Sequence, residues 1–181
     1  MGVIQVGDRK FRLSLSEKEI LAPVRRVASE INRDYEEKNP LFLGMLNGAF
    51  MFAADLMKEI VIPCRISFVK FSSYQGTQTT GTVQEVIGLK ESIKGRHVII
   101  VEDIVETGLT MRHTLDTLSE SEPASLKVCA LLCKPSRLQA DLGDAMKYVA
   151  LNIQDDFIVG YGLDYDGYGR NFRDIYTLSN E

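Results

Sequence analysis

The chain has 181 residues, of which 45% are hydrophobic and 25% are charged, and this composition is typical of one folded globular domain. A net charge of -4 provides no basic field for holding nucleic acid by counterion release, so we expect no nucleic-acid partner. The sequence shows no signal peptide and no apolar run of membrane-spanning length, and its three cysteines, Cys64, Cys129 and Cys133, are expected to be buried free thiols. These features favour a cytoplasmic protein with no membrane partner.

The first element in chain order is an amphipathic helix. Ser16 and Glu19 have the spacing of a capping box at its start. Apolar residues then recur at helical spacing, at Ile20, Val24, Val27 and Ile31. Pro23 falls in the second turn and removes a hydrogen bond, so the pattern predicts either a kink or a later start of the helix.

Apolar runs of strand length then alternate with segments of helical spacing. The predicted strands cover residues 41–46, 65–71, 97–101 and 126–134, and the predicted helices cover 49–60 and the segment around Met111, Leu115 and Leu118. Residues 72–85 are rich in Ser, Thr, Gln and Gly, which favours a long mobile loop or a weak hairpin. Buried strands separated by helices are typical of a parallel α/β sheet.

The last third has a different character. YVALN (148–152) and FIVGYGLDY (157–165) resemble strands, whereas DYDGYGRNFRDIY (164–176) is rich in turn-forming residues. The pattern predicts a small C-terminal cap on the main sheet.

The segment that follows the run HVIIV carries the chemistry. Ligands of open α/β sheets bind beyond the carboxyl ends of the strands, and Glu102, Asp103 and Glu106 come at such an end. Next, Gly108 permits a tight turn, and the hydroxyls of Thr107 and Thr110 add hydrogen-bond donors to a helix start, which suits a phosphate. A carboxylate beside a phosphate requires a sugar diol or a divalent metal, so the constellation indicates a phosphorylated ribose.

Three other interpretations of the glycine-rich and acidic segments are disfavoured. A Walker loop requires a G-x-x-x-x-G-K-[ST] pattern, which the sequence lacks, and GYGLDYDG (160–167) has its third glycine too late for a dinucleotide fingerprint. Two lone acids could merely solvate a strand end, but the ordered E-D-x-x-E-T-G-x-T run disfavours that interpretation.

The string VIIVEDIVETGLT resembles the phosphoribosyl pyrophosphate (PRPP) binding motif of type I phosphoribosyltransferases. LGMLNGAFMFAADL, FVKFSSYQGTQTTG, LLCKPSR and FIVGYGLDYDGYGRN resemble, in the same order, segments of the hypoxanthine-guanine phosphoribosyltransferases. The resemblance extends from about residue 9 to residue 178. It implies one domain over residues 1–181 with the type I α/β fold, in which a mostly parallel sheet is flanked by helices. The core would cover about residues 36–155, a hood about 1–15 and 156–181, and a mobile loop about 72–88.

The resemblance also implies the role of each part of the site. The ribose and 5′-phosphate of PRPP would be bound by Glu102, Asp103, Glu106, Thr107, Gly108, Leu109 and Thr110. Pyrophosphate would be bound by Arg170 and by Leu46, Asn47 and Gly48, a loop that contains a non-proline cis peptide in relatives. The purine would be bound by Lys134, Phe157, Ile158, Leu163 and Asp164, and Mg²⁺ by Asp164, Glu102 and Asp103. Ser73 and Tyr74 would belong to the mobile loop that closes over the reaction.

The implied reaction transfers phosphoribosyl from PRPP to hypoxanthine, and also to guanine, giving IMP or GMP and pyrophosphate, in a homodimer or homotetramer. Glu106 stands where relatives usually carry a catalytic aspartate, so either the backbone retracts to compensate for the longer side chain or Glu106 is a weaker base. Asn47 stands where a basic residue was expected and brings no charge to pyrophosphate. The alternative is a PRPP-sensing regulatory protein of the same fold with weak catalysis.

Overall fold

The computed structural model describes residues 2–72, 84–87, 89 and 91–179. Its helices and strands, in chain order, are β1 (Val3–Val6), β2 (Arg9–Leu15), α1 (Glu17–Asp34), β3 (Leu41–Met45), α2 (Phe50–Glu59), β4 (Arg65–Ser72), β5 (Gln84–Ile87), β6 (His97–Val105), α3 (Leu109–Ser119), β7 (Ser125–Cys133), the single turns η1 (Pro135–Arg137) and η2 (Gly143–Ala145), β8 (Tyr148–Asn152), β9 (Ile158–Val159) and β10 (Ile175–Leu178). Within this part of the chain, no helix has both the length and the apolar character needed to cross a membrane.

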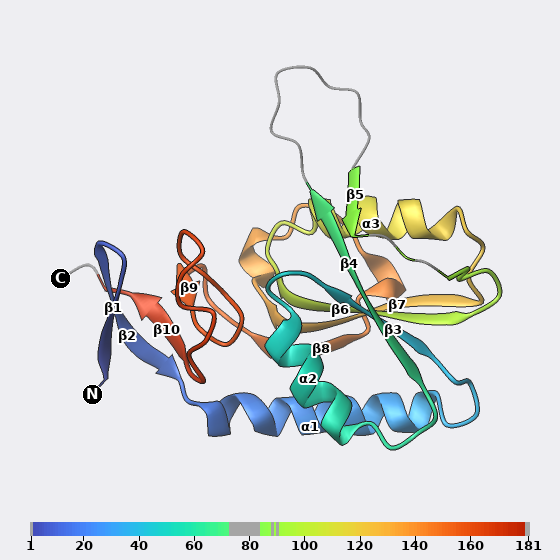
Figure 1. Ribbon diagram of the computed structural model, residues 1–181, viewed down its shortest axis with the longest axis horizontal. Coiled ribbons are helices and arrows are strands. Elements are labelled where there is room, and N and C mark those ends of the chain that lie inside the picture. The colour runs from blue at the N-terminus through green and yellow to red at the C-terminus, as the bar shows by residue number, and fades with distance from the viewer. Residues whose placement is uncertain (1, 73–83, 88, 90, 180–181) are drawn as a thin grey trace.

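The larger sheet has the strand order β5-β4-β3-β6-β7-β8. Strands β4, β3, β6, β7 and β8 pair in parallel, and only β5 is antiparallel to its neighbour, β4 (Figure 1). The predicted α/β class with a mostly parallel sheet is therefore confirmed.

Helices cover both faces of this sheet, which explains the unbroken apolar run of β6. Ile99 and Val101 pack in the same core cluster as residues of α1 and α2, including Ile20 and Phe52. Val98 and Ile100 point to the other face and share a cluster with Met111 and Leu115 of α3.

Helix α1 begins with the predicted capping box, because the Ser16 backbone N–H donates to Glu19 Oε2 at 2.9 Å. The helix begins at Glu17 and continues through Pro23 to Asp34, so the predicted later start is wrong. One missing N–H is outweighed by the apolar stripe of the helix. Its four predicted positions, Ile20, Val24, Val27 and Ile31, are all buried, and Ala28 is buried beside them.

The two ends of the chain form a second sheet, which we call the hood. Its order is β1-β2-β10-β9 and its pairs are antiparallel. Figure 1 shows it at one end of the molecule, beside the start of α1 and close to both termini. Val6, Phe11 and Val159 form its small core.

Two boundaries differ from the sequence-based expectation. Strand β6 extends to Val105, because its parallel ladder with β7 includes Glu102 and ends at the pair of Val105 and Cys133. Glu102 and Asp103 therefore lie on the strand and not after it. In FIVGYGLDY only Ile158–Val159 is a strand, since residues 160–162 all have positive φ.

Residues 72–85 were expected to form a mobile loop or a weak hairpin. Their described residues at the two ends belong to β4 and β5, whose antiparallel pairing agrees with the second alternative. The expected loop residues Ser73 and Tyr74 lie outside the described residues, so the mobility of the loop stays a prediction.

Candidate active site

The candidate site lies where the order of the larger sheet reverses. From β3 the chain continues to β4 on one side, whereas from β6 it continues through β7 to β8 on the other. Ligands of open α/β sheets bind at such a switch point, outside the carboxyl ends of the strands. The segments that follow β3, β6 and β7, namely residues 46–48, 106–110 and 134, therefore meet at one edge.

The turn between β6 and α3 is built to accept an anion. Gly108 has φ 76°, in the left-handed region that favours glycine, and forms the N-cap of α3. The Thr107 carbonyl accepts the N–H groups of Gln139 and Ala140 at 2.9 and 3.1 Å, which anchors the turn. Because the first N–H groups of a helix have no acceptor within it, those of Thr110 and the next residue are available to a ligand.

A cavity of about 270 Å³ opens at this turn. Its lining consists of Glu102, Ile104, Val105, Glu106, Thr107, Gly108, Thr110 and Met111. Seven residues were predicted to hold the ribose and phosphate, and five of them, all except Asp103 and Leu109, line this one cavity. Leu109 is exposed at the start of α3.

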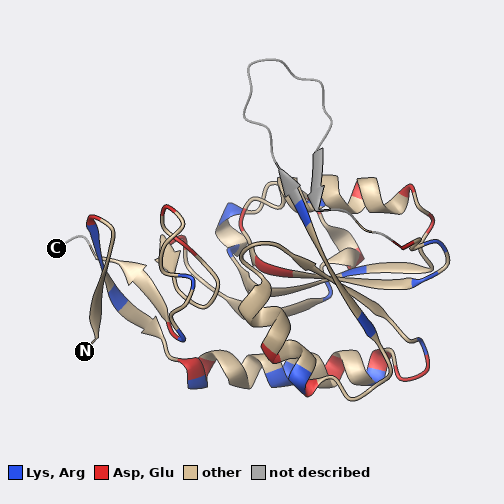
Figure 2. Cartoon of the chain, in the orientation of Figure 1, with Lys and Arg blue, Asp and Glu red and all other residues tan. Residues whose placement is uncertain are grey.

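Glu102 and Asp103 form an acid pair that is largely withdrawn from solvent. Burial raises the pKa of Glu102 well above its usual value, and the charge of Asp103 raises it further. Burial also raises the pKa of Asp103, although hydrogen bonds and the charge of Arg170 act in the opposite direction. Figure 2 shows acidic ribbon on β6 inside the fold, whereas much of the other charge lies along α1 and on loops.

Gly48 is the point where three parts of the site touch. A Cβ on Gly48 would lie 1.5 Å from Asp103 Oδ2, and a Cβ on Gly162 would lie 2.1 Å from the Gly48 carbonyl oxygen. The peptide bond between Leu46 and Asn47 is cis, as the resemblance implied for this loop. The backbone at Gly48 is thus packed against the Asp103 side chain at the end of β6 and against the Gly162 backbone after β9.

Arg170 and Asp164 meet beside this loop. Arg170 Nη1 donates to the Gly162 carbonyl at 2.7 Å, and Arg170 Nη2 lies 2.6 Å from Asp164 Oδ1. The other oxygen of Asp164 accepts the N–H of Gly167 at 2.7 Å. The guanidinium and the carboxylate predicted for pyrophosphate and metal are therefore direct partners.

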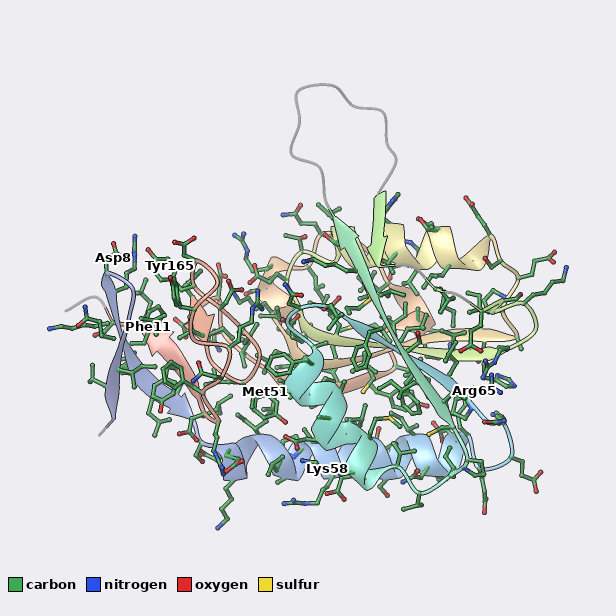
Figure 3. The ribbon with its side chains drawn as sticks, viewed as in Figure 1. Asp8, Phe11, Met51, Lys58, Arg65 and Tyr165 are labelled. Atoms are coloured by element: carbon green, nitrogen blue, oxygen red, sulfur yellow. The ribbon has the colours of Figure 1, made fainter. Side chains whose placement is uncertain are left out.

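The residues predicted for the base lie at the next strand and at the hood. Lys134 directly follows β7 and is buried, and its Nζ lies 2.9 Å from Glu106 Oε1 and 3.4 Å from Asp155 Oδ1. Phe157 is 48% exposed, and its ring is supported by Phe11 and Tyr165 at centroid distances of 6.2 and 5.8 Å. Figure 3 labels Phe11 and Tyr165, which lie near each other in the hood.

Ile158 and Leu163 are buried beside Phe157, in β9 and in the turn that follows it. Their side chains serve the core, since both belong to the same cluster as residues of α1 and α2. Only backbone groups of these two residues remain for recognition of a ligand.

Three carboxylates were expected to hold magnesium, but the described residues contain no group of three His, Cys, Asp or Glu side chains arranged around one point. Asp164 is paired with Arg170 instead, so the assignment of Mg²⁺ to Glu102, Asp103 and Asp164 stays a prediction. Magnesium usually takes one or two carboxylates and completes its shell with water and substrate phosphate oxygens. The pair of Glu102 and Asp103, adjacent and partly buried on β6, fits that donor set.

Sequence reasoning missed two groups of contacts at the site. Asp155 lies within reach of both Lys134 and Arg137, and nothing in the string DDF distinguishes it from a solvated acid. The Tyr161 hydroxyl donates to Asp55 Oδ2 at 2.6 Å and so joins the hood to α2. Contacts between residues 106 positions apart leave no periodic signal in the sequence.

A mostly parallel sheet with an acid pair and a glycine-containing turn into a helix at its switch point is the arrangement expected of an enzyme that binds a phosphorylated sugar. Residues 15–166 match the family model described as the phosphoribosyl transferase domain. The chain is 41% identical to the hypoxanthine phosphoribosyltransferase of Haemophilus influenzae, with 87% of this chain and 89% of the relative covered. It is 36% identical to the hypoxanthine-guanine phosphoribosyltransferase of Aquifex aeolicus, with 97% and 99% covered.

A solved structure of the Trypanosoma cruzi hypoxanthine phosphoribosyl transferase superposes with a TM-score of 0.86 at 35% identity, covering 97% of this chain and 95% of that one. That structure belongs to a study of the role of the C-terminal region in oligomeric state and activity. The chain belongs to the hypoxanthine-guanine phosphoribosyltransferase family, and the resemblance recognised in the sequence is confirmed.

Proposed function

We propose that this protein is a purine salvage enzyme that transfers 5-phosphoribosyl from PRPP to hypoxanthine, and to guanine, giving IMP or GMP and pyrophosphate. The family supports this reaction, as does one observation above all. The buried Lys134 ammonium meets Glu106 at the edge where the anion-binding turn begins. A base-recognition group and a proton acceptor thus stand beside the cradle for the sugar phosphate.

The PRPP half of the site is assigned as follows. The Glu102 and Asp103 carboxylates accept the hydroxyls of the ribose, and the turn from Thr107 to Thr110 donates its N–H and hydroxyl groups to the 5′-phosphate. Leu46, Asn47 and Gly48 present backbone groups to pyrophosphate, and the planar guanidinium of Arg170 pairs with its oxygens. Asn47 carries no charge, so Arg170 is the cation assigned to this group.

The metal assignment is the finer part of the proposal. Mg²⁺ would be held by Glu102 and Asp103, with Asp164 in reach of the leaving group, and would supply charge that offsets the negative charge developing on pyrophosphate. The raised pKa of both strand carboxylates supports the assignment, since a cation would relieve the cost of their burial.

In the base half of the site, Lys134 donates to the 6-oxo group of the purine. A lysine ammonium is a pure donor, so the amino group of adenine would oppose it. The exposed face of Phe157 stacks on the base, worth about 1 to 3 kcal/mol, and backbone groups at Ile158 and Leu163 contact its edge. N9 attacks C1′ with inversion as pyrophosphate leaves, and Glu106 accepts the proton from N7.

The remaining assignments concern the setting of the enzyme. We assign residues 72–88 as a mobile loop that brings Ser73 and Tyr74 over the reacting centre, where exclusion of water protects an oxocarbenium-like transition state. Core, hood and loop together form one domain. We further assign a homodimer or homotetramer in the cytoplasm, where three unpaired cysteines would remain reduced.

The direct test is nucleotide formation from PRPP and Mg²⁺ with hypoxanthine, guanine, xanthine and adenine supplied separately. The proposal requires IMP formation with hypoxanthine, GMP with guanine, and little product with adenine. Tight binding of PRPP without product from any base would instead identify a PRPP-sensing protein, an alternative that no observation favours.

A further inference from the structure

Asp155 has no role in the proposed reaction as described above. It lies in the connection between β8 and β9, two residues before Phe157, and its side chain is 48% exposed. Its Oδ1 atom is 3.4 Å from Lys134 Nζ, and its Oδ2 atom is 3.6 Å from Arg137 Nε. Asp155 therefore joins the base-recognition lysine to a second cation on η1.

The ammonium group of Lys134 has a limited number of hydrogen-bond donors. An ammonium group has three N–H bonds, and the side chain of Lys134 is only 5% exposed, so water cannot freely satisfy them. Glu106 Oε1 at 2.9 Å accepts one and Asp155 Oδ1 accepts a second, at a longer distance. One N–H of Lys134 therefore remains for a ligand, and the 6-oxo group of a purine requires one donor.

The two acceptors come from different segments of the fold. Glu106 follows β6, and Asp155 precedes β9, so the ammonium is held between the core sheet and the hood. Without Asp155, the strongest remaining attraction on Lys134 would be Glu106 alone. With a single N–H fixed by Glu106, the ammonium could turn about that contact, and neither of its other N–H bonds would be held in the direction of the base.

From this geometry we infer that Asp155 is a positioning residue for purine recognition: together with Glu106 it fixes two N–H bonds of the Lys134 ammonium, and so fixes the direction of the third N–H for the 6-oxo group. The inference rests on the proposed function. Asp155 acts through Lys134 and touches neither sugar nor phosphate, so its loss affects binding of the base and spares binding of PRPP. Arg137 holds the second oxygen of Asp155 and limits the rotation of its carboxylate.

The test compares Asp155→Asn with Asp156→Asn, a neighbouring exposed acid for which no contact with Lys134 exists among the described residues. Steady-state kinetics would give kcat and the KM values for hypoxanthine and for PRPP. We expect Asp155→Asn to raise the KM for hypoxanthine about tenfold, equivalent to about 1.4 kcal/mol, and to leave the KM for PRPP within about twofold. Asp156→Asn should match the wild type, and Asp155→Glu should recover part of the loss.

Two outcomes would overturn the inference. Asp155→Asn could behave like Asp156→Asn, or it could raise both KM values equally, which would indicate a general disturbance. A wild-type enzyme that forms no nucleotide would instead refute the proposed function itself. Calorimetric titration with IMP separates the cases, since Asp155→Asn should weaken IMP binding about tenfold even where turnover is not measured.

Discussion

Two acidic sites lie within five residues of each other on the segment from β6 to α3, and they differ in how their charge is met. Glu102 and Asp103 sit on the strand, where burial raises the pKa of both carboxyl groups and no cation faces Glu102 directly among the residues described. Glu106 sits in the turn, where its carboxylate meets the ammonium of Lys134 at 2.9 Å.

This difference in how the charge is balanced indicates which ligand each acidic site is suited to bind. Two adjacent carboxylates whose pKa values are raised by burial gain from a metal ion or from hydroxyl donors, so they suit the ribose and the magnesium of PRPP. An acid that already has a cation gains little from a second one. Glu106 and Lys134 instead offer an acceptor and a donor together, the combination that a 6-oxopurine requires.

The largest expected effect comes from removing the proposed proton acceptor, Glu106, in the turn between β6 and α3. Glu106→Gln should lower kcat by about 10² to 10⁴, the usual contribution of a positioned proton acceptor, because an amide does not take up the proton from N7. The rate of IMP formation at saturating PRPP and hypoxanthine would measure it. A variant that kept more than about half of the wild-type kcat would show that Glu106 is not the acceptor.

The next effect tests the packing behind the acid pair. Gly48→Ala places a methyl group where Asp103 Oδ2 now lies, at 1.5 Å from the new Cβ, so Asp103 must move. We expect kcat/KM for PRPP to fall about a hundredfold, as for other displacements of about 1 Å at a reacting centre.

Gly2→Ala is the matched control, because a Cβ at that position meets no atom within 4 Å. Its kinetics should equal those of the wild type. Wild-type kinetics for Gly48→Ala as well would mean that the position of Asp103 is unimportant for PRPP.

A smaller effect concerns stability. Burial raises the pKa of Glu102, so the free energy of unfolding falls as the pH rises from the ordinary pKa of glutamate towards the raised pKa, and the loss is complete above it. Glu102→Gln should therefore stabilise the ligand-free protein by about 1 kcal/mol near neutral pH while it weakens PRPP binding.

The sign of this effect can be followed with pH. As the pH falls through the raised pKa, the wild-type carboxyl takes up a proton in the folded state, and the advantage of the variant should shrink and disappear below the ordinary pKa of glutamate. Urea unfolding of both proteins at several pH values would measure the difference. An advantage that persisted in acid would assign the stabilisation to another cause.

The parts of this fold that depend on local patterns could be predicted from the sequence. Apolar periodicity predicted α1, its buried face and the alternation of strands and helices, and Ser16 with Glu19 located the start of α1. The rule for ligands at strand ends predicted the turn that includes Gly108, because acids, glycine and hydroxyls occur there in sequence.

The remaining features depend on contacts between distant segments. Strand β2 pairs with β1 on one side and with β10, from the other end of the chain, on the other side, and the pattern of residues 3–15 alone was too weak to identify these strands. Asp155 and Lys134 are 21 positions apart, and their proximity follows only from the crossing of the chain from β8 to the hood. The length of β6 was likewise set by its ladder with β7 and not by its own residues.

Calorimetric titration of Mg²⁺ and PRPP into the wild type, Glu102→Gln and Glu106→Gln tests the division between the two acidic sites most directly. We predict that Glu106→Gln binds PRPP within about threefold of the wild type, whereas Glu102→Gln loses at least about tenfold in affinity. Equal losses in the two variants would contradict the assignment of Glu102 to the sugar phosphate and of Glu106 to the base.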